Sequence, residues 1–345
     1  MLASYSMISH SPDGQYISVH RLVQAVTRSV QSEAERAAAR ATAACLLEAA
    51  LPDDPGSMSA WPAYARLLSH ARAVLVPTSS GMAALVSYLS ISGDYRTART
   101  LQQQRFGALR DSLGPEHPDT LLVGAELARW TGEAGDAAAA RDLCIALLPI
   151  RERVSGPEHP DTLIIRADLA RWTGQVNDVT AARDQFAALL PVHERVLGPE
   201  HPRTLNVRAN LAYWTGEAGD AAAARNLCAA LLPIHERTSG PEHPDTLSDL
   251  AELARWTGDA GDAAAARDLL AALLPIRERG SGPEHPRTLI VRAEHARWTG
   301  EAGDAAAARD LFAALLPIRE RVLGPEHSST LFAQAQLARW TGKAG

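Results

Sequence analysis

The sequence is poor in the residues that define several common classes of protein. Only three of its 345 residues are cysteine; Cys45, Cys144 and Cys228 form no Cys-x-x-Cys pair and lie within apolar, helix-like patterns. We interpret them as small buried hydrophobic residues of a protein kept in a reducing compartment. Aromatic residues make up 5% of the chain although 46% of it is hydrophobic, so the core has to be built from alanine and leucine. This composition favours closely packed helices.

An excess of positive charge is also absent. The chain has 34 Lys+Arg against 40 Asp+Glu, a formal net charge of −6, and no run of basic residues, which argues against nucleic acid as a partner. No apolar stretch approaches the roughly 18 residues that a membrane-spanning helix needs. The first residues lack the basic segment and apolar run of a signal peptide. We therefore expect a cytoplasmic protein with no membrane partner.

Motifs of catalysis and of cofactor binding are missing as well. The chain contains no Gly-x-x-x-x-Gly-Lys-[Ser/Thr] segment, no Gly-x-Ser-x-Gly and no His-Glu-x-x-His. Acidic residues that recur at a fixed interval are explained by the solvation of helices. We expect no catalytic residue, no cofactor and no enzyme activity, with an enzyme of unrecognised type as the last alternative.

What the sequence does contain is an internal repeat with a period of 42 residues. Gly-Pro-Glu-His begins at six positions with this spacing, which are Gly114, Gly156, Gly198, Gly240, Gly282 and Gly324. Tryptophan recurs with the same spacing, at Trp130, Trp172, Trp214, Trp256, Trp298 and Trp340. Self-similarity at such a period is the signature of an array in which each unit buries its apolar face against its neighbours.

Each unit reads as a helical hairpin. Apolar residues recur at helical spacing over 118–132 and again over 136–154, and glycines follow both segments. Pro118 suits a first helical turn, where we expect Asp119 and Thr120 to supply acceptors for the free amides. Pro149 lies inside the second segment and should kink or break it, as its counterparts should in the later units.

The pattern of Leu127, Gly135-Asp136, Ala140 and Cys144 resembles the tetratricopeptide repeat, and the Leu-Gly-Pro-Glu-His-Pro linkers with the 42-residue period resemble its kinesin light chain subtype. A weaker copy precedes these units, so the resemblance covers residues 79–345. The last copy stops before its second helix. The resemblance implies an all-α fold, a right-handed superhelix of the α-solenoid type.

Residues 1–32 have a different character. Short alternating segments flank Asp13-Gly14, a turn pair typical of a β-hairpin, and a helix is predicted over 20–30. Tyr16-Ile-Ser-Val-His-Arg-Leu-Val-Gln24 resembles the end of the winged helix that follows the nucleotide-binding domain in STAND-type ATPases of the NB-ARC kind. We therefore expect a winged-helix remnant at 1–32, a bridging helical pair at 33–78, with helices over 33–51 and 61–76, and the repeat array at 79–345.

The histidine of each Gly-Pro-Glu-His linker invites a metal-site interpretation. Equivalent positions of stacked units lie about one repeat apart, far beyond the ~2.0 to 2.1 Å at which histidines bind zinc. We expect a structural role in the linkers and no metal site. The residues concerned are His117, His159, His201, His243, His285 and His327.

Candidate binding residues come from the first helix of each unit, from which the family lines its concave groove. Small residues at the positions of Ala125 keep that groove open, and arginines recur along it as a ladder at Arg129, Arg171, Arg255, Arg297 and Arg339. Pairing within each helix, as Arg129 can make with Glu126 and Glu133, is one interpretation of the ladder. The other is recognition of a peptide. The third unit departs most from the rest, because it carries Asn206, Asn210 and Tyr213, and Asn210 resembles an asparagine with which kinesin light chains hold a peptide backbone.

Together these features predict a non-catalytic module that binds a protein or peptide in its groove. Two settings remain open: the sensor arm of a STAND-type signalling protein without its ATPase domain, and a free-standing repeat scaffold. Because the final helix, with Leu331, Leu337 and Trp340, has no sequence partner beyond it, we expect it to cap a monomer. The alternative is weak self-association through its exposed apolar side.

Overall fold

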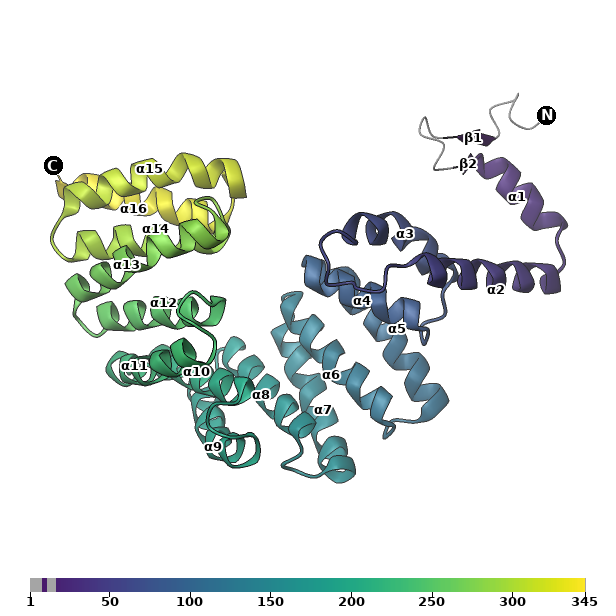
Figure 1. Ribbon diagram of the computed structural model, residues 1–345, viewed down its shortest axis with the longest axis horizontal. Helices are drawn as coiled ribbons and strands as arrows, with labels where there is room; N and C mark the ends of the chain where they lie inside the picture. Colours follow the sequence, from purple (N-terminus) through teal and green to yellow (C-terminus); the bar gives the residue numbers. More distant parts are fainter. Residues whose placement is uncertain (1–7, 11–16, 345) are drawn as a thin grey trace. The chain divides into compact units, whose positions relative to one another are not determined.

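The computed structural model describes residues 8–10 and 17–344, and in these residues the protein is all-α apart from one small hairpin, with sixteen helices (Figure 1). The chain divides into two compact units, Met1–Ala134 and Gly135–Gly345. The first contains α1 (Arg21–Val30), α2 (Glu33–Ala50), α3 (Trp61–Val74), α4 (Ser80–Ser92), α5 (Tyr95–Leu113) and α6 (Pro118–Glu133). The second contains α7 (Ala137–Ser155), α8 (Pro160–Gln175), α9 (Val179–Leu197), α10 (Pro202–Glu217), α11 (Ala221–Thr238), α12 (Pro244–Asp259), α13 (Ala263–Ser281), α14 (Pro286–Glu301), α15 (Ala305–Leu323) and α16 (Ser328–Ala344).

The start of the chain holds the only strands among the described residues. β1 (Ile8–His10) pairs antiparallel with β2 (Ile17–Val19), in the register Ile8 to Val19. The predicted Asp13-Gly14 turn lies outside the described residues, as does the segment before Ile8. No described residue of α1 or α2 is fully buried; α2 contributes only the half-buried Ala44 and Leu47 to the core of this unit. The winged-helix remnant and the three-part division of the chain stay predictions.

The core of the first unit lies between α3, α4 and α5. Tyr64 is fully buried, its hydroxyl donates to the carbonyl oxygen of Pro52 at 2.6 Å, and its ring stacks on Tyr88 at 5.0 Å. Leu85 and Leu89 of α4 pack in the same cluster. Large rings therefore do appear in this core, where alanine and leucine alone were expected.

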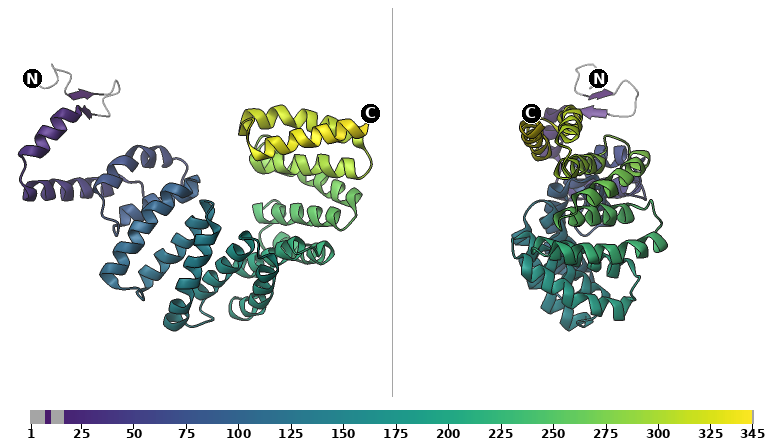
Figure 2. Two further views of the ribbon diagram at one scale, coloured as in Figure 1. Left: turned by 180° about the vertical axis from the view of Figure 1, so that it is seen from behind. Right: turned by 90° about the vertical axis from the view of Figure 1, so that its left-hand side faces the viewer.

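The second unit is a stack of helical hairpins that follow one another in chain order (Figure 2). From α8 to α15, each helix packs against the one before and the one after it, and the even-numbered helices α8, α10, α12, α14 and α16 also contact one another in succession. We call these even-numbered helices the first helices of the repeats. A typical repeat core joins Leu163, Ala182 and Phe186 with Trp214 of the next repeat. The predicted α-solenoid architecture is confirmed.

Side chains cap both helices of every hairpin in this unit. His159 precedes α8, and its Nδ1 accepts a hydrogen bond from the backbone N–H of Asp161 at 3.2 Å. Asp178 precedes α9 and accepts from the backbone N–H of Ala181 at 3.3 Å. The linker histidines therefore have a structural role, as predicted. The expected acceptors of the first turn were wrong, because the histidine fills that role and the threonine donates instead, as Thr162 does to the carbonyl of Gly156 at 2.8 Å.

Four of the repeated tryptophans, from Trp214 to Trp340, each pack directly on a glycine of the repeat before. A Cβ placed on Gly216 would lie 2.5 Å from three ring atoms of Trp256, and the same holds at similar distances for Gly174 with Trp214, Gly258 with Trp298 and Gly300 with Trp340. Only glycine lets the ring approach the helix backbone this closely. The Trp-Thr-Gly sequence thus supplies both sides of the contact between repeats. The tryptophan of a repeat packs on the preceding repeat, and its glycine receives the tryptophan of the following one.

The glutamates of four linkers also have a partner. Arg195, near the end of α9, pairs with Glu158 at 2.6 Å, and the same pair recurs as Arg237 with Glu200, Arg279 with Glu242 and Arg321 with Glu284. Each bridge ties the linker that precedes a hairpin to the end of that hairpin's second helix. The groups are about half exposed, so a single bridge contributes little, about 0 to 1 kcal/mol.

Two expectations from the sequence need correction. Of the kink or break predicted at Pro149 and its counterparts, the break does not occur, because the second helices run through these prolines as α7, α9, α11, α13 and α15. Residues at this position and four before it face solvent, as Pro149 and Ile145 do, so water can satisfy the carbonyl that loses its donor. Cys45 is exposed on α2 rather than buried, because that helix packs too little; Cys144 and Cys228 are buried as expected.

Candidate functional site

The candidate binding residues lie on the first helices. Asn206, Asn210 and Tyr213 come from α10, Arg171 from α8, Arg255 from α12 and Arg297 from α14. Asn206 and Asn210 are one turn apart and Tyr213 follows on the next turn, so all three share one side of α10. We call the side chains on α10, α12 and α14 the first-helix surface: Asn206, Asn210, Tyr213, Arg255 and Arg297. Arg129 belongs to the other unit, where it is partly buried on α6.

Each arginine of the ladder in the second unit stacks over the tryptophan that follows it. The distance from the guanidinium carbon to the ring centroid is 4.2 Å for Arg255 over Trp256 and 4.3 Å for Arg297 over Trp298. Arg171 and Arg339 do the same at 4.6 Å over Trp172 and Trp340. A cation over an indole face is attracted by the ring quadrupole. The arginines therefore cover the tryptophans that join the repeats.

The same arginines form ion pairs between repeats. Arg255 donates to Glu217 at 2.5 Å, Arg297 to Asp259 at 3.2 Å and Arg339 to Glu301 at 2.8 Å. In each pair the acid lies at the end of the preceding first helix. From the sequence we expected pairs within one helix, of which Arg297 with Glu294 at 3.3 Å is an example. The signal for the pairs between repeats was present, because both residue types recur every 42 positions.

These pairs change the character of the ladder. Arg255 has three acidic neighbours, which are Glu217, Glu252 at 3.8 Å and Asp259 at 3.9 Å. Its side chain is 33% exposed, and that of Arg297 is 30%. The arginines of the first-helix surface are thus paired with neighbouring carboxylates, whereas the second interpretation of the sequence had both groups presented to a peptide.

The asparagines of α10 are organised differently. The Asn210 amide nitrogen donates to the backbone oxygen of Asn206 at 2.9 Å and to its side-chain oxygen at 3.1 Å. Among the described residues, nothing donates to the Asn210 side-chain oxygen and nothing accepts from the Asn206 amide nitrogen. Asn206 is exposed and Asn210 half-buried. The pair therefore offers one acceptor and one donor group to a ligand.

Tyr213 replaces an arginine of the ladder and preserves the contact between repeats with its ring. It meets Trp214 edge-on at 4.9 Å and Trp256 of the next repeat at 6.4 Å, and Arg255 lies 5.6 Å from its centroid. Burial raises the pKa of its hydroxyl, with a further contribution from Glu217. Tyr213 is therefore a neutral aromatic side chain between the asparagine pair and the first charged bridge.

Sequence reasoning missed a buried pair of ionisable side chains behind this surface. His235 of α11 and Asp249 of α12 are hydrogen-bonded through Nδ1 and Oδ2, and both are buried. Burial raises the pKa of Asp249, and the hydrogen bond to His235 opposes that shift. The signal was an aspartate at a position where the other repeats have Val123, Ile165, Val207, Val291 and Ala333.

Comparison with known families covers most of the repeats. Models described as tetratricopeptide repeat match residues 122–161, 162–203, 210–279 and 296–329, together more than half of the chain. The chain belongs to the tetratricopeptide repeat family. These tetratricopeptide repeats also resemble solved structures. One is from a protein of Podosopora anserina assigned to the kinesin light chains, with nearly identical TPR-like repeats: 27% identity, TM-score 0.53, 59% of this chain and 97% of that one.

Two further neighbours share the fold at lower identity. BtubC (BKLC) from P. vanneervenii is 20% identical with a TM-score of 0.52, over 74% of this chain and 95% of that one. A chain of the APC/C hetero-tetramer Cut9–Hcn1 is 15% identical with a TM-score of 0.55, over 88% of this chain and 54% of that one. No curated protein matches this chain.

Neither a membrane span nor a metal cluster occurs in the described part of the chain. None of the helices there has the length and apolar character needed to cross a bilayer. No group of three or more His, Cys, Asp or Glu side chains in the same residues is placed to hold a metal ion.

Proposed function

We propose that the repeats bind an extended segment of a protein partner on the first-helix surface, centred on α10, and catalyse no reaction. The observation that carries the proposal is the asparagine pair, whose open acceptor and donor lie on a surface where the charges are already paired. A peptide backbone offers one N–H and one C=O per residue. Asn206 and Asn210 can bond both without any charge on the ligand.

The surroundings of the asparagine pair favour binding because they limit the free energy that is lost when side chains are ordered. Association loses free energy when side chains must be ordered on contact. Here the neighbouring arginines are already fixed by tryptophan stacking and by ion pairs between repeats, and Tyr213 adds a ring of the kind enriched at energetically dominant interface positions. One structural neighbour is itself part of an assembly of different proteins, the APC/C hetero-tetramer Cut9–Hcn1.

The biological setting belongs to the same proposal. We favour the sensor arm of a STAND-type signalling protein in the cytoplasm, on the resemblance of residues 16–24 to the end of a winged helix. A free-standing scaffold is the alternative. The family matches begin at Leu122 and do not bear on this choice. An in-frame phosphate-binding loop encoded just upstream would support the sensor arm, and a separate promoter immediately before this coding sequence would support the scaffold.

The binding proposal is tested by selecting peptides from a random display library on the full chain and measuring the affinity of two isosteric variants. Asn210→Asp introduces the residue that the preceding repeat has at Asp168; Asn226→Asp, on the exposed side of α11, likewise matches Asp184. We expect Asn210→Asp to weaken binding about tenfold, the equivalent of ~1.4 kcal/mol, and Asn226→Asp to leave it unchanged. Equal affinities for both variants, or selection of no peptide, would refute the proposal.

A further inference from the structure

A second candidate site lies at the linker end of the hairpins, between α12, α13 and α14. Residues there enclose a pocket of about 370 Å³. Its wall includes Arg277 and Gly280 of α13, Arg287 of α14 and the linker residues Glu242 and His285. None of these residues belongs to the first-helix surface, so a ligand in this pocket is independent of the proposed function.

Arg277 is the central side chain of this pocket. It is 5% exposed, its Nε has no hydrogen-bond partner, and within the described chain its guanidinium makes a long hydrogen bond, 3.4 Å from Nη2 to the Ser248 hydroxyl. A buried guanidinium is costly unless its charge is compensated. Burial lowers the pKa of Arg277, and the positive charge of Arg287 lowers it further. Arginine nevertheless stays charged in proteins.

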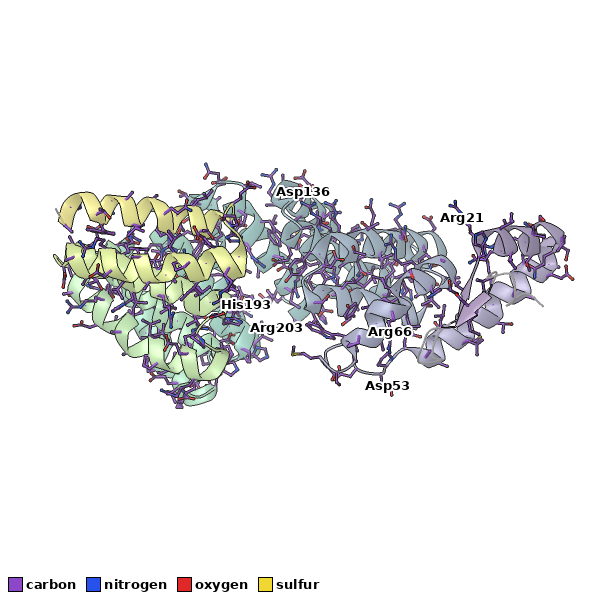
Figure 3. The ribbon with its side chains drawn as sticks, turned by 90° about the horizontal axis from the view of Figure 1, so that it is seen from above. Arg21, Asp53, Arg66, Asp136, His193 and Arg203 are labelled. Carbon is purple, nitrogen blue, oxygen red and sulfur yellow. The ribbon has the colours of Figure 1, made fainter. Side chains whose placement is uncertain are left out.

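In other repeats the Nε of the equivalent arginine likewise has no partner, but the terminal nitrogens of the side chain are compensated. Arg151 lies 3.8 Å from Asp161, the residue ten positions later, and Arg319 donates to the backbone oxygens of Ser329 and Leu289 at 2.5 Å and 2.8 Å. Where the later residue is Arg203, the buried position holds His193; both are labelled in Figure 3. The pKa of His193 is lowered chiefly by burial. Only Arg277 and Arg287 combine an arginine at the buried position with a second arginine at the position of Asp161.

The pocket also owes its space to a local substitution. Gly280 stands where other repeats have Val154, Val196, Thr238 and Val322. A Cβ built on Gly280 meets nothing within 4 Å. The carboxylate of Glu242, the one acid in the lining, is bound by Arg279 at 3.2 Å. With that pair neutral, the two guanidinium groups leave about two positive charges without a counter-charge.

We propose that this pocket binds a small phosphate monoester, whose phosphate lies between Arg277 and Arg287. A phosphate monoester carries close to two negative charges at neutral pH and presents three oxygen acceptors. Guanidinium groups match such oxygens in pairs. His285 adds a donor, because its Nδ1 accepts from the backbone N–H of Arg287 at 3.2 Å and its Nε2 carries the proton in the neutral ring. The space beyond the phosphate admits a small organic group.

The test measures binding of three probes to the full chain by calorimetry: inorganic phosphate, glycerol 3-phosphate and acetate. We expect both phosphates to bind and acetate to bind about tenfold more weakly or less, since it carries half the charge. Acetate binding as well as phosphate would overturn the assignment to phosphate, as would binding of inorganic phosphate without glycerol 3-phosphate. No binding of either phosphate would overturn the site itself.

Variants locate the binding in this pocket. Arg287→Asp recreates the pair of Arg151 with Asp161, so it should fold at least as stably as the parent and lose phosphate binding about tenfold or more. Gly280→Val restores the residue of the other repeats and should weaken glycerol 3-phosphate more than inorganic phosphate. Arg203→Asp makes the same exchange beside His193 and should leave binding unchanged. Phosphate affinity that survives Arg287→Asp, or that falls equally in Arg203→Asp, would refute the proposal.

Discussion

The contact between glycine and tryptophan predicts that replacing glycine by alanine changes the free energy of unfolding in opposite directions at two equivalent positions. Alanine is favoured over glycine in a helix interior by about 0.8 to 1.0 kcal/mol. At Gly216, however, the new Cβ would lie 2.5 Å from three ring atoms of Trp256, which is 3% exposed. Ordinary contact of such atoms is about 3.5 to 4.0 Å, so the ring has to move by about 1 Å within a packed core.

The expected cost lies between two limits. Overpacking of this kind costs typically about 1 to 3 kcal/mol, and complete loss of a buried large side chain about 3 to 5 kcal/mol. After subtraction of the gain in helix propensity from the centres of these two limits, Gly216→Ala should lower the free energy of unfolding by about 1 to 3 kcal/mol. Gly342 is the same position of the last repeat, and nothing lies within 4 Å of its Cβ. Gly342→Ala should therefore be neutral or stabilising by up to about 1 kcal/mol.

Equilibrium urea unfolding followed by far-ultraviolet circular dichroism measures both variants against the parent. A third comparison, Gly216→Ala in a Trp256→Leu background, should cost much less than in the parent, because the ring that alanine displaces is gone. Equal effects at Gly216 and Gly342, or a cost at Gly216 that is independent of Trp256, would refute the contact between glycine and tryptophan.

Two further predictions concern buried ionisable groups. Burial lowers the pKa of His193 and His295 below 6.5, so just below that pH the unfolded chain binds more protons than the native one, and the free energy of unfolding should fall as the pH falls from 6.5 through the native values. Urea titrations at pH 7 and at about pH 5 measure this slope. A slope equally steep in the double variant His193→Gln, His295→Gln would contradict the assignment. The raised pKa of Asp249 has the opposite effect at lower pH, where it makes the free energy of unfolding rise as the pH falls. Asp249→Val recreates the His193 and Val207 arrangement of the preceding repeat, where the Nδ1 of the buried His193 lies 3.2 Å from the carbonyl oxygen of Leu189. The variant should be neutral or stabilising by up to about 1 kcal/mol, because it removes a carboxyl group whose burial costs free energy. Thermal unfolding checks this, and a loss of more than about 3 kcal/mol, typical of a buried pair that loses one partner, would show that the pair stabilises the fold.

The architecture could be predicted from the sequence because the period of 42 residues fixes which positions are equivalent. Helix boundaries came within a few residues, as for Pro118–Glu133, since Pro and Gly punctuate each hairpin. Contacts between repeats were harder, because a period does not say which neighbour a side chain meets. Pairing within one helix was therefore the only ion pairing considered for the arginine ladder, and the bridge from Arg255 to Glu217 was missed.

The properties of single repeats were the least predictable. Pro149 was expected to disturb its helix, but its effect depends on whether water reaches the freed carbonyl, which only the packing decides. The hydrogen-bonded pair of His235 and Asp249 and the like charges of Arg277 and Arg287 both arise from substitutions in one copy of a repeated position. Such exchanges are visible in the sequence, but their meaning depends on which residues the turn between hairpins brings together.

The central claim is that the tetratricopeptide repeats hold a peptide on the first helices around the asparagine pair of α10. Hydrogen–deuterium exchange of the full chain, with and without a saturating selected peptide, tests it most directly. We expect slower exchange in Pro202–Glu217 and Pro244–Asp259, and unchanged exchange in the second helices Val179–Leu197 and Ala221–Thr238. Protection confined to those second helices, or to the linkers between hairpins, would contradict it.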